Sequence, residues 1–363
     1  MGTTTSRDTF TLKTTILRVA KYTGLFALMR AATRKRARIL CYHAGSIGDE
    51  RHYNPKLFCT EQQLRQRLAW LQRNGFVPAT LDQVTQPGGA GLAGIPVVLT
   101  LDDGWYSSYR DLLPAMAEYG HSPSLYLHTE AYDAGAPIIP VTLRYLLWTA
   151  GARKVSLEGF GAGIDGAWDL ADGQQRERLV LATEKWLRSE DPAALAGCLE
   201  RFAAAIGIAP AQLDLASRRF NYMTRDELLS AAANGCSIEL HGHLHVYMPG
   251  HPEQNRANIE LCRERIRAAG LPEATHYCYP SGSFDDQAAD VMRSAGVATA
   301  TTCLPGLVDM RDPDARWFLP RFLDGGSVDM IEFEAEMSGF LEMVRLLARR
   351  PQRPGRALRS SAA

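Results

Sequence analysis

Two adjacent carboxylates, Asp102 and Asp103, follow a short apolar run that ends at Leu101. Such a run is typical of a buried strand, and the loop after a strand's carboxyl end is where α/β folds collect their chemistry. Two like charges side by side are unfavourable unless a cation or separate proton-transfer tasks divide their roles. The pair therefore indicates a metal and raises the question of where its other ligands lie.

A cluster of three histidines follows a second short apolar run, 237–240. His241 and His245 are four residues apart, and on a helical turn that spacing would place both rings on one side. With one carboxylate they would form a two-histidine, one-carboxylate set, which is common for a divalent metal with open positions. A lone histidine is more often an ordinary core or surface residue, but three within five residues favour metal binding. We expect His243 to point away.

Together these motifs resemble the polysaccharide deacetylases of the NodB-homology type, a carbohydrate esterase 4-like family. T-L-D-D-G resembles the family's first motif, H-G-H-L-H its second, and Y-P-S-G its third, a Pro-Gly turn. I-L-C-Y-H resembles the opening strand of one branch of the family, and L-P-R a late strand of that branch. In chain order the five segments are 39–43, 100–104, 241–245, 279–282 and 319–321.

The resemblance implies a role for each motif residue. Asp103, His241 and His245 would hold a divalent metal, with zinc expected and cobalt, manganese or nickel as alternatives. Asp102 would act as general base and take a proton from the attacking water.

The third motif would shape the wall of the site beside the acyl carbonyl. Tyr279 and Pro280 are therefore expected to bind substrate, and Gly282 to permit the tight turn.

Two departures from the family pattern concern proton transfer. Many members carry an arginine before the third-motif proline, thought to orient the catalytic aspartate, and none stands there in this chain. Many also have a late histidine that acts as general acid, and no histidine follows His276. His43 is our candidate for the proton donor or oxyanion partner.

Strand-like and helix-like runs alternate along the chain, which indicates an α/β fold with a parallel sheet. We expect a (β/α) barrel, a distorted seven-stranded NodB-type barrel over 39–325, whose site residues meet at the carboxyl-terminal rim. The expected strands are 38–42, 97–101, 123–127, 236–240, 275–279, 298–303 and 317–322, and the expected helices are 60–73, 107–119, 224–234 and 253–269.

Residues 131–222 interrupt the alternation of strands and helices, and this segment is too long for an ordinary loop. Helix-like pieces at 142–149, 174–188 and 192–206 predict a helical insertion over the rim. Its aromatics (Tyr145, Trp148, Trp168 and Trp186) would suit a lid that selects substrate, but a packing subdomain without substrate contact fits equally well. A C-terminal helix and a basic tail are expected over 326–363.

Charge is distributed unevenly although the chain of 363 residues has a formal net charge of zero. Residues 1–38 hold nine Lys or Arg against one Asp, and residues 345–359 hold six Arg and no acid. The N-terminal segment is also amphipathic, so it would suit either an interfacial helix on anionic lipid or a helix packed on the domain. Its apolar runs are too short for a membrane span or a secretory signal.

Seven cysteines without a CxxC pair favour a reducing compartment. We therefore expect a cytoplasmic protein, with peripheral contact to the inner face of the membrane as a further expectation from the basic N-terminal segment. Basic residues without interleaved aromatics argue against nucleic-acid binding.

The expected reaction is hydrolysis of an N-acyl group, most often N-acetyl, from an amino sugar. The expected substrate is a lipid-linked, nucleotide-linked or small glycoside intermediate of glycan biosynthesis. Two alternatives remain: a C–N hydrolase acting on a non-sugar amide, and a non-catalytic glycan- or membrane-binding protein on the same fold.

Overall fold

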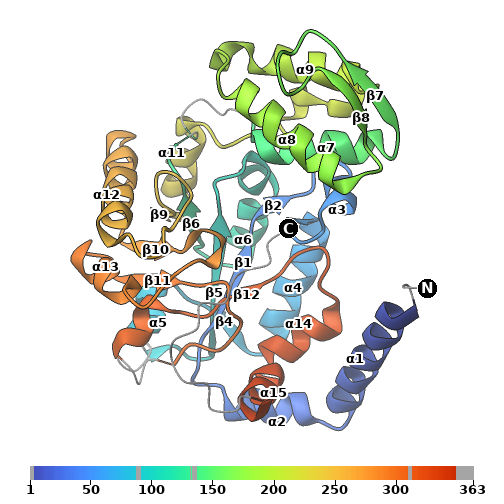
Figure 1. Cartoon of the computed structure of the whole chain (residues 1–363). Coiled ribbons are helices and arrows are strands. Elements are labelled where there is room, and N and C mark those ends of the chain that lie inside the picture. Colours follow the sequence, from blue (N-terminus) through green and yellow to red (C-terminus); the bar gives the residue numbers. More distant parts are fainter. Residues whose placement is uncertain (1–3, 87–90, 131, 133–136, 310–312, 349–363) are drawn as a thin grey trace.

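The computed structural model describes residues 4–86, 91–130, 132, 137–309 and 313–348. Its main sheet is wholly parallel and runs in the order β11–β10–β9–β6–β5–β1–β12, with the short strand β4 beside the start of β5. A parallel bridge from Thr301 to Leu319, just ahead of β12, links the two ends of this order and closes the barrel. Figure 1 shows the barrel strands in the middle of the molecule with helices around them. The predicted (β/α) barrel is therefore confirmed.

Six of the seven barrel strands coincide with predicted ones, with ends shifted by a few residues. The last predicted strand, 317–322, overlaps the observed strand only at Phe322. They are β1 (Arg38–Tyr42), β5 (Ile95–Asp102), β6 (Ser124–Leu127), β9 (Ser237–Leu240), β10 (His276–Cys278), β11 (Thr299–Thr301) and β12 (Phe322–Leu323); the short strands β2 (Ala44–Gly45), β3 (Phe58–Cys59) and β4 (Phe76–Pro78) accompany them.

Helices cover the outside of the barrel, and their starts follow local capping rules. Thr60 and Thr224 each accept a bond from the backbone three residues on, and the side chain there bonds back to the cap. The covering helices are α4 (Glu61–Arg73), α6 (Leu113–Glu118), α11 (Arg225–Ala233), α12 (Pro252–Ala268) and α13 (Ala288–Ser294). The short α3 (Glu50–Tyr53) contacts β3, and α5 (Leu81–Thr85) packs in a cluster with Ile39 and Val98. The predicted helix 107–119 begins as a π-helical turn, Ser108–Leu112.

Alternation along the strands decides which side chains enter the barrel. On β5, Leu99 and Leu101 join the core beneath the helices. Val98 faces the other way and packs with Ile39 and Tyr126 in a separate cluster. Asp102, four residues after Val98, therefore points into the barrel at its carboxyl-terminal end.

The predicted insertion forms a subdomain with its own hydrophobic core, above the barrel in Figure 1. Its three main helices match the predicted pieces: α7 (Ile139–Ala150), α8 (Gly173–Leu187) and α9 (Leu195–Ala205). The antiparallel pair β7 (Lys154–Leu157) and β8 (Gly166–Asp169) was not predicted, and the short α10 (Pro210–Leu213) completes the subdomain. Residues 131 and 133–136 lie outside the described part of the chain.

Four helices pack together near the end of the barrel where the strands begin. α1 (Thr4–Tyr22) and α2 (Leu25–Ala32) bury Leu17, Ala20 and Phe26 against Ala335 and Phe340 of α14 (Met330–Met337) and α15 (Phe340–Ala348). The N-terminal segment is thus docked on the domain. Within the described residues, no helix is long and apolar enough to cross a membrane. Most of the predicted basic tail lies outside them.

Candidate active site

Asp102 is held in the barrel by a buried guanidinium. Arg321, which leads into β12 and is fully buried, donates to Asp102 Oδ1 at 2.6 Å and to Oδ2 at 2.9 Å. It also bonds to Thr100 Oγ1 and to the carbonyl of Thr302, so its plane is fixed. Burial alone would raise the pKa of Asp102, but the adjacent guanidinium outweighs it, and the pKa falls to about 2. The carboxylate is therefore ionised throughout the neutral range.

Sequence reasoning placed Arg321 in a late strand but did not assign it to the site. The arginine missing before the third motif is thus supplied from another strand. Its only sequence signal was a cationic residue inside an apolar run, and such a residue is seldom fully buried unless it is paired.

Two thiols complete the surroundings of Asp102. Cys41 Sγ lies 3.5 Å and Cys278 Sγ 3.6 Å from Asp102 Oδ2. Burial raises the pKa of both thiols well above the usual range, so they remain neutral donors beside the carboxylate.

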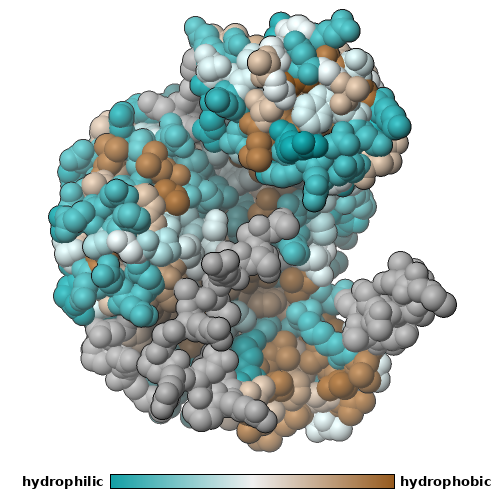
Figure 2. Space-filling model, viewed as in Figure 1, coloured by the Kyte–Doolittle hydropathy of each residue, from teal (hydrophilic) through white to brown (hydrophobic). Residues whose placement is uncertain are grey.

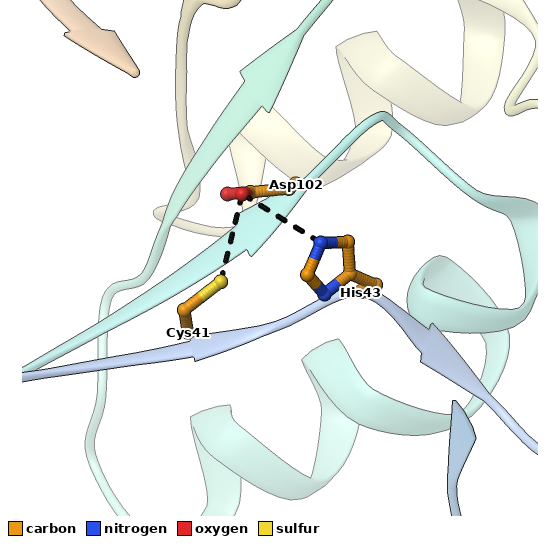
Figure 3. A group of neighbouring side chains, drawn as sticks. All are labelled: Cys41, His43 and Asp102. Atoms are coloured by element: carbon orange, nitrogen blue, oxygen red, sulfur yellow. Dashed lines mark hydrogen bonds and ion pairs between the residues drawn. The ribbon is translucent and has the colours of Figure 1, made fainter. Parts of the chain in front are cut away.

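His43 follows β1 and faces Asp102 from the neighbouring strand, as Figure 3 shows. Its Nε2 lies 3.9 Å from Asp102 Oδ2, and its side chain is 18% exposed. An imidazole that is close to the carboxylate and partly open to solvent can exchange protons with a bound molecule. The role of His43 as proton donor or oxyanion partner stays a prediction.

The second carboxylate, Asp103, lies one residue beyond the strand and turns to the rim. Its backbone has a φ of 75°, in the left-handed region, and its amide donates to the carbonyl of Tyr126. Asp103 Oδ1 lies 3.3 Å from His241 Nε2 and 3.2 Å from His245 Nε2. The three predicted metal ligands are therefore brought together by residues far apart in the sequence.

The two histidines are positioned by a loop and not by the helical turn that we expected. Gly242 has a φ of 75° and His245 a φ of 51°, which no helix allows. Asn258 on α12 fixes this loop: its Oδ1 accepts from the amides of His243 and Leu244. The His243 ring turns aside to Thr129 Oγ1, as predicted.

The charges of this group suit a divalent cation. Asp103 Oδ1 is buried and has no hydrogen-bond partner of good geometry in the described structure. His241 Nδ1 donates to the carbonyl of Cys278, at 2.9 Å, which leaves Nε2 with a lone pair toward Asp103. Burial would raise the pKa of Asp103, but the two imidazoles hold it well below its usual range. One anionic oxygen and two imidazole nitrogens are a donor set for zinc or a similar ion.

A further imidazole near the metal-ligand group was not predicted. His128 follows β6, is buried, and its ring centroid lies 5.0 Å from those of His245 and Tyr222. Burial lowers its pKa to about 3, so its ring is neutral. Only its position directly after a strand could have indicated it.

The third motif is placed differently from our prediction. Tyr279 is fully buried, and its hydroxyl donates to the carbonyl of Trp317 within the hydrophobic core. Pro280 is buried as well, so neither side chain forms an open wall for substrate. Gly282 does make the tight turn, with a φ of 67°, and an added Cβ would lie 2.9 Å from Cys303 Cβ.

Three of the insertion's four candidate lid aromatics take part in packing, whereas Trp148 is 40% exposed. Tyr145 does so in a cluster that includes Phe58 and Trp105 of the barrel. Tyr145 is buried against Phe220, and Trp186 packs edge-on against Phe160. Trp168 donates to the carbonyl of Ile164. These contacts agree with the packing subdomain that we kept as the alternative to a lid.

Comparisons with known proteins agree with this geometry. Residues 209–300 match the family model described as polysaccharide deacetylase. A stretch of 58 residues is 38% identical to the poly-beta-1,6-N-acetyl-D-glucosamine N-deacetylase of Escherichia coli K12. That stretch covers 15% of this chain, and it spans only 9% of the length of the curated relative.

Two solved structures share the fold over most of their length. IcaB from Ammonifex degensii is 14% identical with a TM-score of 0.50, over 84% of this chain and 97% of that one. The deacetylase PplD from Streptococcus pyogenes is 13% identical with a TM-score of 0.53, over 84% and 99%.

A parallel barrel with a carboxylate pair and two histidines at its rim defines a NodB-type deacetylase fold. The family model matches about a quarter of the chain, and this match agrees with the resemblance to polysaccharide deacetylases that the motifs carry.

Proposed function

We propose that this protein hydrolyses an N-acyl group, with N-acetyl as the first candidate, from an amino sugar in a metal-dependent reaction. The observation that carries the proposal is the division of labour between two adjacent carboxylates. Asp102 points into the barrel and is bound by Arg321, whereas Asp103 points to the rim and meets His241 and His245. A binding protein that had lost catalysis would have no need of this arrangement.

The rim group, Asp103 with His241 and His245, would hold the metal. When bound, a divalent ion supplies Lewis-acid chemistry, which polarises an acyl carbonyl and acidifies a water molecule. The His241–Cys278 hydrogen bond fixes the ring that faces Asp103, and the Asn258 contacts hold the loop that carries His245. We propose zinc, since the donors are two imidazoles and one carboxylate.

Asp102 would accept the proton of the attacking water at Oδ2, the oxygen that lies nearest His43. Arg321 fixes the carboxylate plane, so the lone pair is aimed before substrate arrives. His43 would give a proton to the departing amine, because it is the imidazole beside Asp102 and is partly open to solvent. Such acid–base assistance is typically worth about 10²–10⁴ in rate.

The sugar that serves as substrate and the cellular compartment are further parts of the proposal. Cytoplasmic action is supported by seven free cysteines, of which five are buried. There the substrate would be a lipid-linked, nucleotide-linked or small glycoside intermediate. The E. coli relative is named for a β-1,6-linked N-acetylglucosamine polymer, so short oligomers of that sugar are the first compounds to test.

A panel of N-acetylated compounds tests the function. The zinc-loaded protein should release acetate from β-1,6-linked N-acetylglucosamine oligomers, UDP-N-acetylglucosamine or a simple N-acetylglucosaminide, as measured by mass spectrometry. Asp102→Asn serves as the matched control. Turnover of a non-sugar amide alone would assign the protein to another C–N hydrolase class. If the protein turns over none of these compounds, the result would favour a non-catalytic binding protein.

A further inference from the structure

Helix α1 carries two apolar stripes, and the fold uses only one of them. Leu17 and Ala20 are buried against α14 and α15. Leu12, Ile16 and Val19 follow the spacing of a second stripe, and each is more than half exposed. Packing on the domain therefore explains one face of this helix and leaves the other facing solvent.

The neighbouring helices add to this exposed stripe. α2 contacts both α1 and α15, and each contributes leucines that are more than half exposed. In Figure 2, brown residues gather over the end of the molecule where Figure 1 places α1, α2 and α15. We define the apolar face as Leu12, Ile16, Val19, Leu28, Leu346 and Leu347. Exposed apolar patches of this kind are typical of interaction sites.

The surroundings of the apolar face are cationic. Arg18, Arg34 and Lys35 are exposed and have no acidic partner among the residues that the structure describes. Lys13 and Lys21, in contrast, pair with Glu332 and Glu334 of α14. Acidic residues of α14 thus neutralise two of these cations, and Arg18, Arg34 and Lys35 are left exposed without an ion pair in the described part of the chain.

We propose that the apolar face and its basic rim bind the surface of an anionic lipid bilayer. Apolar side chains would enter the acyl boundary while Arg18, Arg34 and Lys35 meet lipid phosphates. A second copy of the chain is a poor occupant, because it would bring two segments with nine basic residues and one acid each together. The arginine-rich C-terminal tail carries the same sign of charge and is repelled likewise.

This placement determines how the active site faces the membrane. α2 leads into the start of β1, where Arg38 donates to the carbonyl of Met337 on α14. The candidate active site lies at the opposite, carboxyl-terminal end of the same strands. A bilayer bound by the apolar face would therefore leave the site open toward solvent. The bound enzyme would accept soluble sugars or the distal part of a lipid-linked glycan.

Sedimentation with vesicles tests the proposal on the full chain, independently of any activity. Wild-type protein should sediment with phosphatidylglycerol–phosphatidylcholine vesicles, and the bound fraction should fall as salt is raised. The double variant Ile16→Ser/Val19→Ser should bind about tenfold more weakly or worse, because two exposed apolar side chains are lost. Leu181→Ser, on α8 of the insertion, changes an equally exposed leucine away from the face and should bind like wild type.

The charged rim is tested by Arg18→Gln/Arg34→Gln/Lys35→Gln. This variant should lose the preference for anionic over neutral vesicles while its thermal unfolding stays unchanged. Equal sedimentation with neutral and anionic vesicles would overturn the proposal, as would unchanged binding by Ile16→Ser/Val19→Ser. If wild-type protein ignores vesicles and instead dimerises, with Ile16→Ser/Val19→Ser monomeric, the face is an interface between two copies and the proposal fails.

Discussion

The ion pair between Arg321 and Asp102 offers a test in which the cost of losing the cation depends on pH. Arg321→Met removes the guanidinium and leaves Asp102, which is 3% exposed, as a buried charge without a cation. Removing one partner of a buried pair typically costs about 3–5 kcal/mol. We expect a loss of that size in the free energy of unfolding at pH 7.5.

The dependence on pH follows from the pKa of Asp102. In the native protein the pKa is lowered from 3.8 to about 2, so pairing stabilises the fold above pH 3.8 and is lost as the pH falls through 2. The drop corresponds to about 2–3 kcal/mol. In Arg321→Met the guanidinium no longer opposes the effect of burial, so the pKa of Asp102 rises. The destabilisation should then be largest at neutral pH and shrink as the pH is lowered toward 4.5.

Urea unfolding at pH 7.5 and pH 4.5 measures this difference. Arg321→Met/Asp102→Asn removes the buried charge as well and should be more stable than Arg321→Met at pH 7.5. Equal destabilisation of Arg321→Met at both pH values would refute the reasoning, as would a double variant no more stable than the single one.

Arg321→Lys separates orientation from charge. Lysine keeps the cation but cannot reproduce the two parallel bonds to Oδ1 and Oδ2. One lost charge-assisted bond is worth about 1.5–3 kcal/mol. Activity should therefore fall by about one to two orders of magnitude while zinc content stays near that of wild type. Full activity in Arg321→Lys would show that the bidentate contact does not orient the base.

Three further outcomes follow from the structure. His245→Ala should lose bound metal, measured by plasma mass spectrometry, and keep its far-UV circular dichroism; full metal content would disprove the ligand assignment. Asp102→Asn should retain metal but lose at least about two orders of magnitude in activity, and loss of metal would make Asp102 a ligand instead. Burial raises the pKa of Glu239 from 4.5 to about 7, so ionisation in the native state costs stability as the pH rises through this window. The free energy of unfolding of Glu239→Gln, measured with urea, should therefore rise relative to that of wild type by up to about 3 kcal/mol between pH 5 and pH 8. A difference between the two proteins that does not change with pH would contradict the raised pKa.

The parts of the fold that the sequence predicted best depend on local patterns. Buried parallel strands read as short apolar runs, so six barrel strands were located within a few residues, and the last was placed several residues too early. The candidate metal ligands were found because the carboxyl ends of parallel strands meet at one rim, whatever their separation in the sequence.

The parts that were missed depend on contacts between distant segments. Arg321 and Asp102 are 219 residues apart. The sequence around either residue does not indicate that the other is its partner. The spacing of His241 and His245 suggested a helical turn, but Gly242 and a contact to Asn258 impose a loop.

Two further side chains illustrate the same limit. A motif letter does not say which way a side chain points, so Tyr279 was expected at the site although it packs in the core. His128 stands alone after its strand, and only the folded barrel brings it beside His245.

The most direct test of the central claim is the stoichiometry of acetate and free amine released by the zinc-loaded protein from N-acetylated amino sugars. The account predicts one acetate for each new amine with wild-type protein, and a rate at least about a hundredfold lower with Asp102→Asn at equal zinc content. Equal rates for the two proteins would contradict it, because Asp102 would then not be the base.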